Sequence, residues 1–149
     1  GNWFMGDVIG HYTGLNDVIA ENTSYDKLSF QMILGYVGAP VAMLIGVCSE
    51  DALLVGQLLG EKTILNEFYA YATLGGMKNE NAFASEKSVV MATYVLCGFA
   101  NFASIGIQIG GIGALAPTRK GLLSKLGVKA LIGGTLACLY TAAIVGMFY

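Results

Sequence analysis

The sequence predicts an all-α integral membrane protein, and the distribution of charge is the main reason. Only 12% of the 149 residues are charged, against about 25% in an ordinary soluble domain, and the mean hydropathy is +0.63. Three runs contain no charged residue: 29–48, 88–118 and 130–149. Because a helix needs about 20 predominantly apolar residues to cross a bilayer, each run is long enough to span it. The 21 glycines fit this class, since small residues let membrane helices pack closely.

The same composition argues against other classes of protein. A soluble, glycine-rich helical bundle would have to place nearly half of its chain in runs without charge. The net charge is −2 and there is no basic patch, so nucleic acid is not an expected partner. Cys48, Cys97 and Cys138 each lie inside an apolar run, without the spacing of a metal site. We therefore expect a chain surrounded by the lipid bilayer, with no metal and no organic cofactor.

The chain begins with a mixed segment, which a predicted span follows. Residues 1–28 combine apolar and polar side chains and are interpreted as the end of a preceding span and a loop. Since the chain opens inside an apolar stretch, we expect it to be a fragment of a longer membrane protein. Residues 29–48 are predicted to form the first complete transmembrane helix. Pro40 should bend this helix, because proline lacks an N–H group and crowds the preceding turn.

Residues 52–77 have a different pattern. Two apolar pieces, 52–59 and 68–77, flank a polar centre, and neither piece is long enough to span by itself. The segment is therefore either one transmembrane helix with a polar centre or a re-entrant helical hairpin. The residues alone do not decide between these alternatives. A polar loop, 78–87, follows.

The third run is too long for one straight helix across a hydrocarbon layer of about 30 Å, at about 1.5 Å per residue. We predict that 88–117 forms a discontinuous transmembrane helix. The loop 119–129 carries four basic residues and no acidic one, so the positive-inside rule places it in the cytoplasm. The terminal transmembrane helix, 130–149, then leaves the C-terminus outside.

Glu67 is the first candidate functional residue. In the stretch GEKTILNEFYAYATL, 60–74, it lies deepest between the apolar flanks. A charge inside the membrane is costly, so such a residue faces the protein interior and has a partner. Lys62 is five residues earlier, which excludes an i, i+4 pair on one helix, and Asn66 can bond backbone groups freed by a turn. The alternative is that 60–67 is an external loop between two in-plane helices.

A second polar feature lies in the stretch GFANFASIGIQ, 98–108. On a continuous helix, Asn101, Ser104 and Gln108 would share one face. If the helix unwinds near Gly98, Phe99 and Asn101 can line one cavity, where non-helical backbone is tolerated at membrane depth. Hydrogen bonding between helices is the alternative role for these side chains. A broken hairpin followed by a broken helix is typical of secondary transporters, which hold substrate between discontinuous helices.

Two motifs resemble those of the concentrative nucleoside transporter family. GEKTILNEFYAY, 60–71, resembles the family signature, in which Gly-x-Lys-Thr precedes Asn-Glu-Phe-Val-Ala-Tyr. GFANFASIGIQIGGIGALAP, 98–117, resembles the run that follows this signature in the family. The match extends from about residue 29 to the end of the chain, in the same order. Tyr69 departs from the pattern, because the family usually has valine there, and this leaves the substrate preference open.

The resemblance implies half of an inverted-repeat transporter fold, with 52–77 as the second re-entrant hairpin and 88–117 as an unwound helix that faces it. It implies import of nucleosides by alternating access, as a symport driven by sodium or protons, in a homotrimer in the plasma membrane. The first hairpin of the family, with its Gln-Thr-Glu motif, and the first broken helix, to which the sodium site belongs, are absent from this sequence. We therefore expect the coupling ion to be bound mainly by the preceding part of the protein.

The resemblance also implies a substrate site. The ribose-binding glutamate of the family matches Glu67, its ribose-binding asparagine and serine match Asn101 and Ser104, and a nearby aromatic residue matches Phe99. We add Asn66, next to Glu67, to the candidate substrate-binding residues. A carboxylate and an amide can hold ribose hydroxyls, which both donate and accept hydrogen bonds, and an aromatic ring gives apolar contact. No catalytic residue is expected, since transport needs no covalent step.

Three other functions stay open at the level of the sequence. The main one is a non-transporting membrane scaffold or assembly subunit, whose polar residues only join helices. An intramembrane enzyme has little support, because His11 is the only histidine and no catalytic cluster is present. An ion channel lined by Glu67 is the third, and saturable, concentrative uptake would exclude it.

Overall fold

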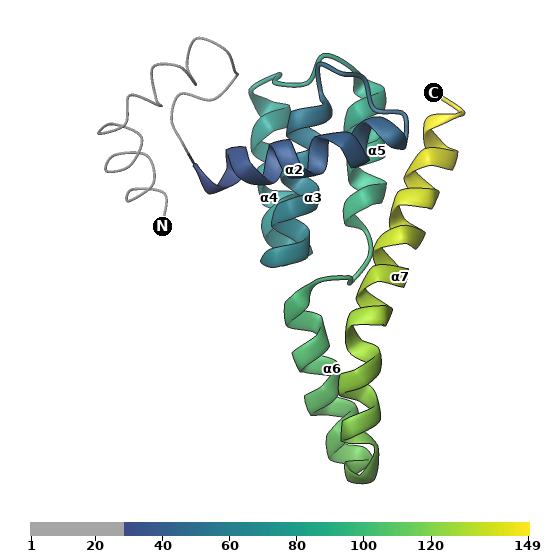
Figure 1. Cartoon of the computed structure of the whole chain (residues 1–149). Helices are drawn as coiled ribbons and strands as arrows, with labels where there is room; N and C mark the ends of the chain where they lie inside the picture. The colour runs from purple at the N-terminus through teal and green to yellow at the C-terminus, as the bar shows by residue number, and fades with distance from the viewer. Residues whose placement is uncertain (1–28) are drawn as a thin grey trace.

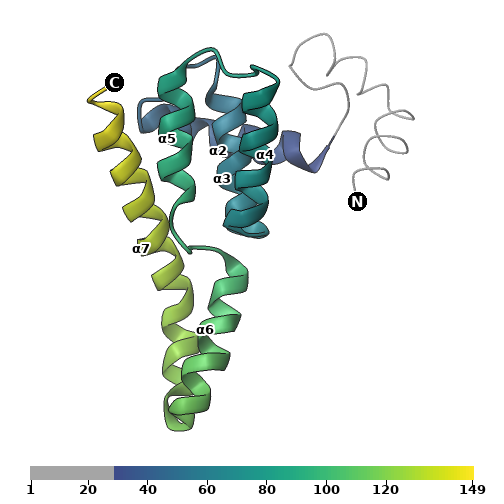
Figure 2. The same ribbon diagram turned by 180° about the vertical axis from the view of Figure 1, so that it is seen from behind.

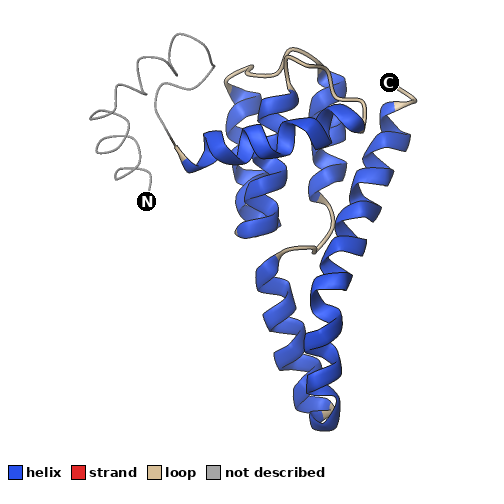
Figure 3. Ribbon diagram, in the orientation of Figure 1, coloured by secondary structure: helices blue, strands red, loops and turns tan. Residues whose placement is uncertain are grey.

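The structure, a computed structural model, describes residues 29–149, and every regular element in this part of the chain is helical (Figure 3). The predicted all-α fold class is confirmed. The segment 1–28, predicted to hold the end of a preceding span and a loop, lies outside the described residues. The elements are α2 Phe30–Leu44, α3 Ala52–Ile64, α4 Glu67–Asn79, α5 Glu86–Leu96, α6 Phe102–Leu115, the short 3-10 helix η2 Pro117–Arg119 and α7 Lys120–Gly146.

The helices form a group at one end of the molecule and a two-helix extension at the other (Figure 1). Helices α3, α4 and α5 stand side by side in the group, and α2 crosses α3. Helices α6 and α7 run antiparallel in the extension and are joined by η2. Helix α7 continues beyond α6 to pack against α5, as the view from behind also shows (Figure 2). It therefore connects the two parts.

Helix α2 is shorter than the span predicted over 29–48. The hydroxyl of Ser29 caps its start, accepting a 3.2 Å hydrogen bond from the backbone N–H of Met32. The chain has left the helix by Gly46, whose φ of 100° is a conformation that glycine adopts readily. The 15 residues of α2 cover about 22 Å, less than a hydrocarbon layer of about 30 Å. Its transmembrane placement stays a prediction.

Helices α3 and α4 fold back on each other through Leu65 and Asn66. Of the two alternatives for 52–77, the structure shows the helical hairpin and not one continuous helix. The side chain of Asn66 stabilises this turn, because its Oδ1 accepts a 2.8 Å hydrogen bond from the N–H of Tyr69 and so caps α4. The depth of the hairpin in a bilayer stays a prediction.

The run 88–117 is interrupted at residues 97–101, between α5 and α6. The run is therefore not one continuous helix, and its crossing of the membrane stays a prediction. At the break, the N–H of Ala100 bonds the carbonyl of Gly98 at 2.8 Å. A side chain at Gly98 would collide with the sulfur of Cys138 on α7, so only glycine allows this close approach.

The C-terminal helix begins earlier than predicted. The segment 119–129, predicted as a loop, is helical: it holds the end of η2 and the first ten residues of α7. That prediction was wrong because basic charge was taken as a sign of a loop, although lysine, arginine and leucine are good helix formers. Within the described residues, Pro117–Gly146 is the one helical stretch that is long and apolar enough to cross a membrane.

Two clusters of buried apolar side chains hold the helical group together. The larger one joins α2, α3, α4 and α5, and its most enclosed members include Leu58, Met91 and Leu96. The smaller one joins α3 and α5 to α7 through Leu59 and Leu139. This packing fixes the hairpin against α5, with the turn of the hairpin next to the break at 97–101.

Candidate functional site

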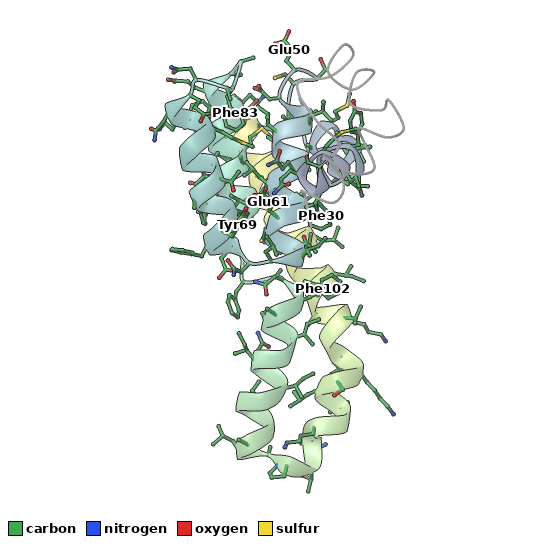
Figure 4. All side chains as sticks on the ribbon, turned by 90° about the vertical axis from the view of Figure 1, so that its left-hand side faces the viewer. Phe30, Glu50, Glu61, Tyr69, Phe83 and Phe102 are labelled. Carbon is green, nitrogen blue, oxygen red and sulfur yellow. The ribbon has the colours of Figure 1, made fainter. Side chains whose placement is uncertain are left out.

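The turn of the hairpin and the break between α5 and α6 meet at one place. Helix α4 begins there at Glu67, and α6 begins there at Phe102. In Figure 4, Tyr69 lies near the hairpin turn and Phe102 at the start of α6, on either side of this junction. The N-terminal end of a helix exposes unpaired N–H groups and carries partial positive charge. Two such ends together favour a carboxylate between them.

Glu67 and Asn101 are in direct contact at this junction. Nδ2 of Asn101 donates a 2.7 Å hydrogen bond to Oε2 of Glu67. Asn101 is 1% exposed, whereas Glu67 is half-buried. The structure therefore brings together two residues that lie far apart in the sequence, and the carboxylate stays partly exposed on the surface of this chain.

Ser104 is hydrogen-bonded to Asn101 and not to Glu67. Its N–H donates to Oδ1 of Asn101 at 2.7 Å, and its hydroxyl donates to the carbonyl of Asn101 at 2.7 Å. The hydroxyl also accepts a 3.4 Å hydrogen bond from the N–H of Asn101, and this bond and the one to Oδ1 form a capping box at the start of α6. In this conformation, the serine holds the asparagine in place, and it would have to release one of these bonds to reach a ligand.

Asn66 and Phe99 differ in their surroundings. Asn66 is exposed, and its Oδ1 is used by the cap of α4. Phe99 is 51% exposed within the break. It lines a mostly apolar hollow of about 270 Å³ between α6 and α7, together with Ser104 and Gln108. Glu67 is not among the lining residues, so the hollow lies beside the polar pair and not around it.

The sequence analysis did not predict that Lys62 and Tyr71 contact helix α5, although both residues belong to the signature. Lys62 is completely buried, and its Nζ donates to the carbonyl of Val95 at 2.8 Å and not to Glu67. The hydroxyl of Tyr71 donates to the carbonyl of Thr93 at 2.9 Å. The only signal for these contacts was the presence of both residues in the motif.

Comparison with known proteins decides the family. The family model described as "Na+ dependent nucleoside transporter C-terminus" matches residues 5–146. The chain belongs to the concentrative nucleoside transporter family. It is 45% identical over 138 residues to solute carrier family 28 member 3 of Eptatretus stoutii, and 47% identical over 121 residues to the uncharacterized transporter YutK of Bacillus subtilis. It is also 43% identical over 134 residues to sodium/nucleoside cotransporter 1 of Sus scrofa.

These matches cover most of this chain but a small part of each of the three relatives. They include 85%, 81% and 82% of the chain, respectively. The chain spans 20%, 29% and 21% of the length of the three relatives. The relatives are membrane transporters and not enzymes, and the chain corresponds to a minor part of such a protein.

Solved structures of the concentrative nucleoside transporter CNTnw have the same fold. A variant of CNTnw in its intermediate 2 state superposes with a TM-score of 0.82 at 33% identity, over 97% of this chain and 33% of that one. CNTnw in an inward-facing, substrate-bound state gives a TM-score of 0.79 at 33% identity, over 95% and 34% of the two chains. The described helices therefore belong to the inverted-repeat transporter fold that these structures have.

Proposed function

We propose that this chain supplies the ribose-binding part of a cation-coupled nucleoside importer. The observation that carries this proposal is the 2.7 Å hydrogen bond between Asn101 and Glu67, where two helix ends meet. The family relationship supports a nucleoside as the substrate, because a relative is named a sodium/nucleoside cotransporter. A half-buried carboxylate beside a buried amide is suited to a sugar, which offers several hydroxyls within a short distance.

The chemistry of binding follows from these two side chains. One ribose hydroxyl can donate to the carboxylate of Glu67, and another can accept from the amide of Asn101. Ser104 keeps Asn101 in place through the capping box. Phe99, which is largely exposed next to Asn101, supplies an apolar surface for the nucleoside. Asn66 contributes by fixing the first turn of α4, where Glu67 lies.

The remaining part of the activity belongs to the whole protein. In this proposal the full-length protein assembles as a homotrimer, imports nucleosides by alternating access, and takes its energy from a sodium or proton gradient. The coupling ion is bound mainly by the part of the protein that precedes this chain. Segment 119–129, now seen as helical, faces the cytoplasm because of its basic residues, and the C-terminus lies outside.

A structural role is the second candidate function. The hydrogen bonds of Ser104 and Asn66 are satisfied within the chain, as expected for residues that only shape helix ends. In a non-transporting scaffold or assembly subunit, the bond between Asn101 and Glu67 would join the hairpin to α6 and do nothing else. Such a protein would need Glu67 to fold but not to transport.

Uptake by the full-length protein separates these two functions. We expect Glu67→Gln to abolish most concentrative uptake of uridine in proteoliposomes, because the amide removes the charged acceptor while it keeps the size of the side chain. Glu80→Gln, at an exposed position after α4, is the control and should leave uptake unchanged. Normal uptake by folded Glu67→Gln protein would rule out the proposed site and favour the scaffold.

A further inference from the structure

Lys62 and Tyr71 are polar residues of the signature at 60–71 that are not part of the proposed ribose site. Lys62 belongs to α3 and Tyr71 to α4, and both reach helix α5. Their hydrogen bonds go to carbonyl groups of this helix and not to Asn101. Their contacts with α5 point to a role behind the site.

Lys62 bonds the C-terminal end of α5. It is 0% exposed, and its Nζ lies 2.8 Å from the carbonyl oxygen of Val95, in the last turn of the helix. Lysine is almost never fully buried without a partner, because removing its amine from water is costly. The last carbonyls of a helix lack partners within the helix and carry partial negative charge. They are therefore well suited to accept from this group.

Tyr71 makes a second bond to the same helix end. Its hydroxyl donates to the carbonyl of Thr93 at 2.9 Å. Thr93 and Val95 are both among the last four residues of α5, whose carbonyls have no N–H partner within the helix. The hairpin thus supplies one side-chain donor from each of its helices to the end of α5.

The same face of α4 also contacts the start of α6. Glu67 and Tyr71 are four residues apart, so they lie on one face of the helix. Tyr71 bonds the end of α5, while Glu67 accepts from Asn101 at the start of α6. The hairpin therefore holds the break at 97–101 from both of its ends.

We propose that Lys62 and Tyr71 are positioning residues, which fix the end of α5 to the hairpin and so place Asn101 opposite Glu67. This inference rests on the proposed ribose site, because it explains how the geometry of that site is maintained. Without these bonds the irregular segment 97–101 is no longer fixed at the end of α5. The amide of Asn101 and the carboxylate of Glu67 then adopt the arrangement that binds ribose for a smaller part of the time.

Hydrogen exchange on the purified full-length protein tests the positioning role without transport. We expect Lys62→Met to raise exchange of the amides at 96–101 by about tenfold or more, which is the factor expected for the loss of one hydrogen bond from a charged group. Lys62→Arg keeps donors at this position and should return the rates toward those of the parent protein. Lys78→Met replaces an exposed lysine in the last turn of α4 and should leave these rates unchanged.

Ribose discrimination in uptake gives a second test. We expect Lys62→Met and Tyr71→Phe to raise KM for uridine by about tenfold, and to raise KM for either 2′-deoxyuridine or 3′-deoxyuridine much less. The nucleoside with the smaller rise lacks the hydroxyl that Asn101 binds, so misplacing Asn101 costs it no bond. The value of kcat should change little. Tyr140→Phe removes the hydroxyl of an exposed tyrosine on α7 and should leave all three KM values unchanged.

Parent-like exchange at 96–101 in folded Lys62→Met protein would overturn the proposal. An equal rise in KM for uridine and for both deoxynucleosides would overturn it too, because that result indicates general destabilisation. If Lys62→Met does not fold, the same two measurements on Tyr71→Phe decide, since this change removes a single oxygen atom. A parent protein that takes up no nucleoside would contradict the proposed function, and hydrogen exchange would still decide the positioning role.

Discussion

Glu67 is the first residue of α4, and Asn101 is the cap of α6, so two helix N-termini point their partial positive charges at one carboxylate. The hydrogen bond from Asn101 adds a direct donor at 2.7 Å. A carboxylate in such surroundings is stabilised without a basic side chain. This explains how Glu67 can stay half-buried and still be available to a ligand.

Ser104 supports Asn101, and its removal should weaken the start of α6. We expect Ser104→Ala to lower the stability of the purified full-length protein by about 1 kcal/mol, the usual net value of one hydrogen bond, because its hydroxyl donates to the carbonyl of Asn101. The measurement is the apparent Tm in detergent. Thr141→Ala, which removes a hydroxyl bonded within exposed α7, is the control. An equal fall in Tm for both variants would contradict a specific role for the capping box.

Asp51 is a second residue on which the structure depends. It lies in the polar connection between α2 and α3, outside the predicted spans, and is 1% exposed. Its Oδ1 accepts from the N–H of Ala84 at 2.8 Å, and its Oδ2 accepts from the N–H of Ser85 at 3.1 Å. Burial raises the pKa of Asp51, but these bonds and those from Ser88 and Cys48 lower it more. The pKa therefore lies below its ordinary value.

The lowered pKa of Asp51 predicts how stability depends on pH. The carboxylate stabilises the fold at neutral pH, and this contribution is lost as the pH falls through the folded-state pKa. We expect Asp51→Asn to lower Tm at pH 7, and the difference from the parent protein to shrink below about pH 4. Glu50→Gln is the control, because Glu50 points away from the helices in Figure 4. A difference that stays constant down to acid pH would contradict this account.

The resemblance to the family predicts a site that includes Glu67, Asn101, Ser104 and Phe99, but it does not predict the hydrogen bonds that these side chains make. A short motif carries residue types, whereas the hydrogen bonds of Ser104 and Asn66 depend on where each helix starts. That start is set by φ and ψ at one residue, which the sequence alone does not specify. The contact between Glu67 and Asn101 depends on tertiary packing and could be inferred only through the family.

The packing of α2 on α3 depends on glycines that leave no room for a side chain. A Cβ atom added at Gly56 would lie 2.6 Å from the carbonyl oxygen of Gly35 and 2.5 Å from the nitrogen of Ala39. Both neighbours are backbone atoms, which cannot move aside without shifting a helix. The two helices can therefore approach this closely only with glycine at the contact.

Alanine substitutions at two glycines should consequently have opposite effects. We expect Gly56→Ala to destabilise the full-length protein by about 1–3 kcal/mol through overpacking. Gly76→Ala, in α4, has no atom within 4 Å of the added carbon and should be neutral or stabilising by up to about 1 kcal/mol. Apparent Tm values of the two variants check this. A larger loss of stability in Gly76→Ala would contradict the described packing.

The sequence predicted helices where the length of an apolar run or the distribution of charge limited the possible structures. The charge-free run 88–118 is too long for one straight helix, so a tilt, a break or an unwound segment was expected, and unwinding near Gly98 was one possibility among these. Glycines crowd the second half of the run, between Gly106 and Gly113, yet that half forms α6 without interruption. The break lies at Gly98, where the nearby sulfur of Cys138 requires glycine, and this requirement is not visible in the local sequence.

The whole molecule leaves many apolar side chains exposed. Apolar side chains on the outer faces of α6 and α7, such as Ile107, Leu115 and Leu136, are exposed in this chain. Large exposed apolar surfaces lie against lipid or against another protein surface. The chain spans 20–29% of the length of the three relatives described above, and in those membrane transporters lipid and the remaining helices can cover the corresponding surface.

The central claim is that the carboxylate of Glu67 binds the ribose of a nucleoside. Equilibrium binding of uridine, 2′-deoxyuridine and 3′-deoxyuridine to the purified full-length parent protein and to Glu67→Gln tests it most directly. We expect loss of at least one hydroxyl to weaken binding by the parent protein by about tenfold or more, and to weaken binding by Glu67→Gln far less. Equal penalties in the two proteins would show that Glu67 does not contact the sugar and would contradict the account.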